Sequence, residues 1–107
     1  MANFAELLQG LPAVDHLDRI ELLPHGDSKV AAVIENKPGQ AGSLRVYHAL
    51  AQRFGGIDAA AARDGLELYA EHTADARDNP GKHPNIDRLL NVIEFGLHYD
   101  VRRVERS

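Results

Sequence analysis

The sequence predicts an α+β fold: a three-stranded, mainly antiparallel sheet, formed by a hairpin and a C-terminal strand, covered by three or four helices. Two β-compatible runs lie within residues 18–35, apolar residues recur at helical spacing between residues 43 and 96, and a last β-compatible run begins at Tyr99. No linker or low-complexity segment divides the chain, so we expect residues 1–107 to form a single domain.

The N-terminal third predicts a short helix followed by the hairpin. Asn3 and Glu6 have the spacing of a helix N-cap and its third helical residue, and Gly10 is placed to end this helix in a left-handed conformation. Residues 18–24 and 28–35 are rich in aliphatic residues that suit strands, and the short glycine-containing segment between them predicts a turn. An isolated hairpin is only marginally stable, so helices or a third strand must cover one of its faces.

Three helices are predicted in the middle of the chain, each with a polar residue as its N-cap. Ser43 caps the first helix, and Asp58 caps the second, which runs to Ala76. Gly65 lies inside this second helix, where it either lets another backbone approach closely or marks a break between two shorter helices. Asn85 caps the third helix, which has little polar surface and is expected to be the most buried element.

Composition excludes several kinds of site. The chain has no cysteine, which rules out disulfides, thiolate zinc sites and cysteine nucleophiles, and which fits a reducing compartment. Residues 1–10 contain no basic segment followed by an apolar one, and no stretch approaches the roughly 20 apolar residues that cross a bilayer. We therefore expect a soluble cytoplasmic protein with no membrane partner.

The charge distribution argues against nucleic-acid binding. The net charge is −4, with five Lys/Arg against six Asp/Glu in residues 1–55 and seven against ten in residues 56–107. Binding to nucleic acid depends on clustered basic residues that neutralise phosphates, and neither half of the chain is basic. We expect no nucleic-acid partner.

Two loops share one pattern. Residues 38–44 and 80–86 each contain Pro-Gly, two variable residues, a turn residue, a polar residue and an apolar helix start. Turn chemistry alone can explain the pattern. The alternative is that each loop binds an anion at the N-terminus of the helix that follows, although neither has the spacing of a phosphate-binding glycine motif. The basic side chains that flank the loops are Lys37, Arg45, Lys82, His83 and Arg88.

The densest run of reactive side chains covers residues 72–87, between two predicted helices. Two imidazoles and two carboxylates in this run have the chemistry to hold zinc or a harder divalent ion. Their spacing matches no metal-binding signature, so the sequence assigns no metal ligand and no cofactor. With an arginine from the first loop included, the candidate ligand-binding residues are Arg45, His72, Asp75, Arg77, Lys82, His83 and Asp87.

Acid–base catalysis is an open alternative at the same place. His72 or His83 has the chemistry of a general base oriented by an aspartate, and Ser43 and Thr73 are the nearby hydroxyl groups. A helix cap explains Ser43, a bond to a helix carbonyl explains Thr73, and no Gly-x-Ser-x-Gly elbow is present. No catalytic residue is assigned, and the sequence favours a protein that is not an enzyme. The remaining histidines, expected at the core edge or in and beside turns, are His16, His25, His48 and His98.

Three stretches of the chain carry a resemblance to a family. They are Gly-Ser-Leu-Arg-Val-Tyr-His-Ala-Leu-Ala at residues 42–51, His-Thr-Ala-Asp-Ala-Arg at residues 72–77 and Pro-Gly-Lys-His-Pro-Asn-Ile-Asp at residues 80–87. On these motifs the chain resembles a small family of uncharacterised bacterial proteins of similar length, a domain of unknown function. The resemblance covers nearly the whole chain. It implies a stand-alone bacterial cytoplasmic protein and no particular activity.

Two hypotheses for function remain open. The first is a non-enzymatic binding or interaction module that self-associates or docks a protein partner. The second is a small-molecule or anion site, with catalysis or metal dependence as options, formed where loops 37–45 and 72–88 meet. A docking surface should expose an apolar patch of about several hundred Å². A ligand site should gather these side chains around one concave pocket: Arg45, His72, Arg77, Lys82 and His83.

Overall fold

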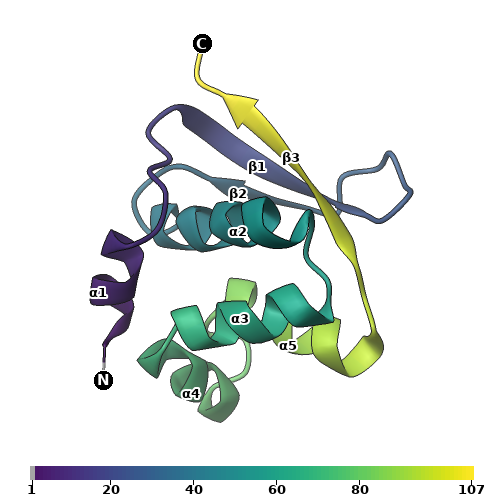
Figure 1. Cartoon of the computed structure of the whole chain (residues 1–107). Coiled ribbons are helices and arrows are strands. Elements are labelled where there is room, and N and C mark those ends of the chain that lie inside the picture. Colours follow the sequence, from purple (N-terminus) through teal and green to yellow (C-terminus); the bar gives the residue numbers. More distant parts are fainter. Residues whose placement is uncertain (1) are drawn as a thin grey trace.

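The computed structural model describes residues 2–107 and confirms the α+β fold and its three-stranded antiparallel sheet. Within those residues the elements, in chain order, are α1 (Phe4–Gln9), β1 (Leu17–Pro24), β2 (Ala32–Glu35), α2 (Ala41–Phe54), α3 (Ala59–Leu68), α4 (Glu71–Asp78), α5 (Pro84–Phe95) and β3 (Tyr99–Glu105). Figure 1 shows α2 next to the strands and α3, α4 and α5 farther from them on the same side of the sheet. None of the helices in residues 2–107 has the length and apolarity that crossing a membrane requires.

The strand order is β2-β1-β3, and β1 pairs antiparallel with both neighbours. Ile20 in the centre of β1 faces Ile34 of β2 and Arg103 of β3. The connection between β1 and β2 is longer than predicted, because β2 begins at Ala32 and not at residue 28. A tight turn forms after β1, with Gly26 at φ 82°, and an extended segment then follows before pairing starts.

One face of the sheet is apolar and packs against α2, whereas the other is charged. Ile20, Leu22 and Ile34 are almost fully buried on the inner face. On the outer face, the Glu21 carboxylate accepts hydrogen bonds from Arg102 at 2.7 Å and from Arg19 at 3.3 Å. The helices therefore cover one face of the sheet only. The outer face is exposed to solvent and carries ion pairs between its own side chains.

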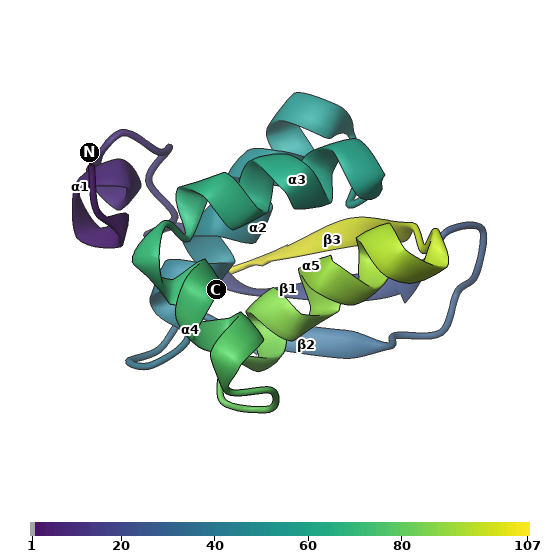
Figure 2. The same cartoon turned by 90° about the horizontal axis from the view of Figure 1, so that it is seen from below.

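The most buried helix is α2 and not α5, which corrects the prediction from the sequence. α2 buries six residues and α5 buries three. The reason is position, because α2 packs against the sheet on one side and against α3 on the other, whereas α5 packs mainly against α3 (Figure 2). The buried residues of α2 are Leu44, Val46, Tyr47, His48, Leu50 and Ala51.

His48 is the polar member of this buried set, with 3% of its surface exposed. It faces β3, where Nε of Arg103 donates a 2.9 Å hydrogen bond to Nδ1 of His48. Burial lowers the pKa of His48, and the nearby charge of Arg103 adds to this effect. Nδ1 of a neutral His48 ring therefore has its hydrogen-bond partner within the core.

The helix predicted from Asp58 to Ala76 is two helices, and the break lies at Ala70 and not at Gly65. Ala70 has φ 53° and ψ −119°, a conformation that costs a side-chain-bearing residue about 1–3 kcal/mol. Gly65 instead allows close packing: a Cβ there would lie 2.7 Å from Leu89 Cδ1 and 2.9 Å from Leu50 Cδ1. Side chains, rather than another backbone, occupy the space that this glycine leaves.

Helix capping agrees with the sequence in two places. Asn3 and Glu6 form the predicted capping box, and the Asp58 carboxylate accepts from the amide of Ala61 at 2.9 Å. Gly10 does not adopt the left-handed conformation predicted for it, since its φ is −85°. Its N–H instead bonds to carbonyls of the last turn, so α1 ends in a right-handed turn that needs no glycine.

Candidate functional site

A pocket of about 340 Å³ lies where the two Pro-Gly loops meet. Its volume is within the range of small-molecule sites, about 300–1,000 Å³. The loop before α2 and the loop before α5 form opposite parts of the lining, although some 40 residues separate them in the sequence. The lining residues are Phe4, Gly39, Ala41, Gly42, Ser43, Tyr69, His72, Lys82, His83, Pro84, Asn85 and Ile86.

The start of α2 faces this pocket without a side-chain cap. The helix begins at Ala41 with Gln40 as N-cap, so Ser43 is not the cap that the sequence predicts. The Gln40 side chain is turned away and accepts from the amide of Glu35 at 3.0 Å. The Ser43 hydroxyl accepts a 2.7 Å hydrogen bond from the hydroxyl of Tyr69. The N-terminal amide groups of α2 therefore lie at the pocket without a side-chain oxygen from their own helix.

The start of α5 also lacks a side-chain cap. Its N-cap is His83, which makes no capping bond, and Pro84 occupies the first turn. Asn85 lies inside the helix and is not its cap, since its Oδ1 accepts from Arg88 at 2.8 Å. Both caps were mispredicted for one reason: the helices begin two or three residues earlier than the polar residues suggest. Two uncapped helix N-termini, each carrying a partial positive charge, therefore converge on one pocket.

Asp75 organises the polar side of the pocket from behind the lining. Its Oδ2 accepts from Nε2 of His83 at 2.6 Å and lies 2.9 Å from Nζ of Lys82. The His83 bond, and then the Lys82 bond, lower the pKa of Asp75 to about 2. Asp75 is therefore a carboxylate at neutral pH, and it must accept from a protonated Nε2 of His83. One charged group thus fixes the orientation of two lining side chains.

An aromatic wall closes another side of the pocket. The ring of Phe4 stacks on Tyr69 at 5.3 Å between centroids and meets the edge of His72 at 5.0 Å. The Phe4 amide donates a 2.8 Å hydrogen bond to the Glu71 carboxylate, which holds α1 against the start of α4. Burial raises the pKa of Tyr69 above its ordinary value, so its hydroxyl stays protonated and donates to Ser43.

Of the seven candidate residues, His72, Lys82 and His83 line the pocket and Asp75 supports them. The other three make contacts elsewhere. Arg45 donates to the carbonyls of Leu11 and Pro12 at 2.7 and 3.2 Å and holds the segment after α1.

Arg77 does not line this pocket but two other hollows, of about 740 and 430 Å³, which residues such as Thr73 and Ala76 also line. Asp87 accepts from the amide of Gly81 at 2.9 Å and closes the Pro-Gly turn. These contacts give Asp87 a structural explanation that is sufficient without a ligand.

The arrangement limits the catalytic alternative. An imidazole hydrogen-bonded to a carboxylate is the basic unit of general-base catalysis, and Asp75 and His83 form such a pair at the pocket. Ser43 lines the same pocket, but its hydroxyl is engaged by Tyr69, and no hydrogen bond joins it to His83 in the described part of the chain. The hydroxyl of Thr73 donates to the carbonyl of Leu66 at 2.6 Å and is buried. The Thr73 hydroxyl therefore bonds to a helix carbonyl, as the sequence suggests.

Sequence reasoning missed a second cluster, formed by His25, His98 and Asp100. Each histidine was explained by a turn, and only the pairing of β1 with β3 brings the three side chains together. Their separation in the sequence, 73 positions between the two histidines, leaves no local spacing that could have revealed them.

Comparison with known proteins places the chain in a family without supplying an activity. One family model matches residues 4–103, and its description is an uncharacterized protein conserved in bacteria. Neither a curated protein nor a solved structure matches the chain.

Proposed function

The chain belongs to that bacterial family, DUF2322, and we propose that it binds a small anion, a carboxylate or a phosphate, in the pocket between the starts of α2 and α5. The observation that carries the proposal is the convergence of two helix N-termini without side-chain caps on one pocket that also presents Lys82. Unpaired N–H groups and a partial positive charge at a helix start favour an anion.

The charges around the pocket support the same ligand class. Lys82 is exposed, and it lines the pocket while it pairs with Asp75 behind the lining. The Asp75 carboxylate close to this side is already bonded to His83 and Lys82. An anion therefore meets donors from two helix starts and from a lysine, while the nearest negative charge is already compensated.

The remaining lining suggests what the anion carries. Phe4, Tyr69, Pro84 and Ile86 supply apolar surface next to the polar groups. Small-molecule sites combine such surface with a few placed polar groups. A compact organic acid or phosphate ester with an apolar or aromatic portion fits this lining better than a bare inorganic ion.

The interaction-module hypothesis has less support. In the part of the chain that the structure describes, the exposed large apolar side chains are Val33 on β2, Phe95 at the end of α5 and Leu97 after it. They come from separate elements, whereas a docking surface needs a continuous patch. We infer that the protein binds its ligand without catalysis, because the Ser43 hydroxyl of the lining is already bonded to Tyr69. We infer a cytoplasmic location, because the chain lacks cysteine. We infer no nucleic-acid partner, because the net charge is −4.

Chemical-shift mapping by nuclear magnetic resonance tests the proposal, with benzoate and inorganic phosphate as probes. We expect saturable shifts of the amides of Gly42, Ser43 and Asn85, which stand in the first turns of the two helices. Benzoate should bind more tightly than phosphate if the aromatic wall contributes. Both affinities should fall as salt is raised, because part of the attraction is electrostatic.

Lys82→Ala and Lys37→Ala form a matched pair of variants. Each lysine makes one exposed ion pair, with Asp75 at 2.9 Å and with Glu35 at 2.7 Å, but only Lys82 lines the pocket. We expect Lys82→Ala to weaken benzoate binding by about threefold to tenfold, which corresponds to roughly 0.7–1.4 kcal/mol, and Lys37→Ala to leave it unchanged. Equal effects of the two substitutions, or shifts spread over the whole surface, would overturn the proposal.

A further inference from the structure

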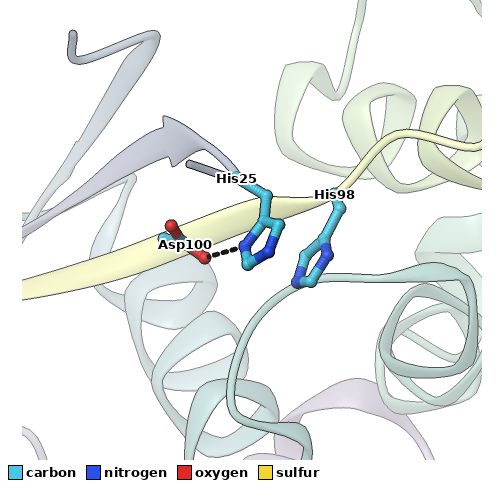
Figure 3. Close-up of side chains that lie close together, drawn as sticks. All are labelled: His25, His98 and Asp100. Carbon is cyan, nitrogen blue, oxygen red and sulfur yellow. Dashed lines mark hydrogen bonds and ion pairs between the residues drawn. The ribbon is translucent and has the colours of Figure 1, made fainter. Parts of the chain in front are cut away.

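A second group of polar side chains lies apart from the pocket, where β1 ends and β3 begins. His25 follows β1, His98 precedes β3, and Asp100 stands in β3 (Figure 3). Nδ1 of His25 lies 2.8 Å from Oδ1 of Asp100, and the rings of His25 and His98 stack with centroids 4.2 Å apart. One ligand atom from each of the three residues lies within 4.8 Å of the other two.

The backbone holds these side chains together. The amide of His25 donates to the carbonyl of His98 at 2.9 Å, and the amide of Gly26 donates to Oδ2 of Asp100 at 3.3 Å. Gly56 leaves room for the His98 ring, because a Cβ at Gly56 would lie only 3.1 Å from Nε2 of His98. Strand pairing therefore places the three residues beside one another.

We propose that His25, His98 and Asp100 bind a divalent transition-metal ion of the Zn²⁺, Ni²⁺ or Cu²⁺ class. Two imidazoles and a carboxylate are ligands that these ions accept, and open zinc sites use three protein ligands with water in the remaining position. Imidazoles do not suit Mg²⁺ or Ca²⁺, which prefer oxygen ligands.

In the free cluster, a hydrogen bond lies where the ion would bind. It joins Nδ1 of His25 to Oδ1 of Asp100 across 2.8 Å, and one proton lies between the two atoms. The ion takes the place of this hydrogen bond, and the proton of a neutral His25 ring moves to Nε2, so that Nδ1 binds the ion through its lone pair. Oδ2 of Asp100 keeps its hydrogen bond to Gly26.

Metal binding requires the two histidine rings to turn. Their planes are nearly parallel, at 6°, whereas the nitrogens of a tetrahedral site converge at about 3.4 Å from each other when metal–nitrogen bonds are about 2.0–2.1 Å. The site therefore requires both rings to rotate about their Cβ–Cγ bonds. Both histidines are exposed, with 63% of the His25 side chain accessible, so solvent gives the His25 ring room to turn.

Calorimetric titration of the full, tag-free chain with Zn²⁺ tests the site. We expect saturable binding of one ion per chain. Asp100→Asn should weaken binding by about tenfold or more, and His25→Ala or His98→Ala should weaken it further. Mg²⁺ should give no saturable heat.

The other histidines supply matched controls. His83→Ala removes an imidazole that also pairs with an aspartate, and His16→Ala removes one outside any such pair. Both should retain wild-type Zn²⁺ affinity. Thermal unfolding with chelator should give wild-type midpoints for the exposed variants His25→Ala and Asp100→Asn, and Zn²⁺ should raise the midpoint of the wild type but not of His25→Ala. Binding that survives His25→Ala, or that disappears with His83→Ala, would overturn the proposal, as would absence of saturable binding to the wild type.

Discussion

Oδ2 of Asp75 accepts a 2.6 Å hydrogen bond from Nε2 of His83, and this bond joins α4 to the residue that precedes α5. The same oxygen lies 2.9 Å from Nζ of Lys82. The carboxylate therefore links the two helices and orients both polar side chains that the second loop presents to the pocket. Its protonation state controls the local structure as well as the local charge.

Asp75→Asn should reduce the dependence of stability on pH in acid. The folded-state pKa of Asp75 is about 2, against an ordinary value of 3.8, so the wild-type bonds stabilise the fold above pH 3.8. This contribution is lost as the pH falls from 3.8 to about 2, because the unfolded chain binds the proton first. Urea unfolding between pH 2 and pH 6 should give a shallower slope for the variant within that window.

The control for this measurement is Asp78→Asn, at the end of the same helix. Asp78 is exposed and forms no ion pair among residues 2–107. Its substitution should leave the slope at the wild-type value. A wild-type slope in Asp75→Asn as well would mean that the His83 and Lys82 bonds do not stabilise the fold.

Ala70→Gly should stabilise the protein by about 1 kcal/mol. Glycine relieves the positive φ of 53°, which costs alanine about 1–3 kcal/mol, and this gain exceeds the greater entropy that glycine has in the unfolded chain. Chemical denaturation measures the change. Ala74→Gly, in the exposed interior of α4, should lose about 1 kcal/mol in the same assay. A loss in both variants would show that Ala70 is not strained.

Gly65→Ala should destabilise the protein by about 1 kcal/mol, although alanine is the better helix former. The added methyl group would stand 2.7 Å from Leu89 Cδ1 and 2.9 Å from Leu50 Cδ1, and both leucines are fully buried and cannot move into solvent. Shortening one of the leucines tests this cause. In a Leu89→Ala background, Gly65→Ala should cost less than in the wild type, and an unchanged cost would exclude the steric explanation.

Tyr69→Phe should cost about 1 kcal/mol of stability while keeping the stack on Phe4. The substitution removes the 2.7 Å hydrogen bond to Ser43 and leaves that hydroxyl without its donor at the pocket. Thermal and urea unfolding report the loss. The double variant with Ser43→Ala should lose less than the two single losses added together, and strict additivity would mean that the two hydroxyl groups do not interact.

The fold class could be predicted from the sequence because hydrophobic periodicity is a local signal that the chain carries in each segment. The caps at Asn3 and Asp58 were predicted because capping is likewise a local signal. The break at Ala70 was not, because no proline or glycine marks it, and the strain is imposed by the packing of α3 and α4 against their neighbours.

The pocket was predicted in outline from the similarity of its two loops. Lys82, His72 and His83 line it, and the meeting of the loops follows from the packing of α3 against both α2 and α5. The direction of the Arg45 side chain could not be read from the sequence, because the carbonyls of Leu11 and Pro12 that attract it belong to a segment 33 or more positions away. Long-range contacts of this kind also explain why His25 and His98 were left without a role.

The helix α1 buries no residue completely, yet its Phe4 forms part of the aromatic wall. Local detachment of such a helix requires far less free energy than global unfolding. Detachment removes one wall of the pocket, so the affinity of any occupant includes the equilibrium between docked and undocked α1. Occupancy of the pocket should accordingly slow amide hydrogen exchange at the N-terminal end of the chain, and truncation of that end should accelerate ligand dissociation.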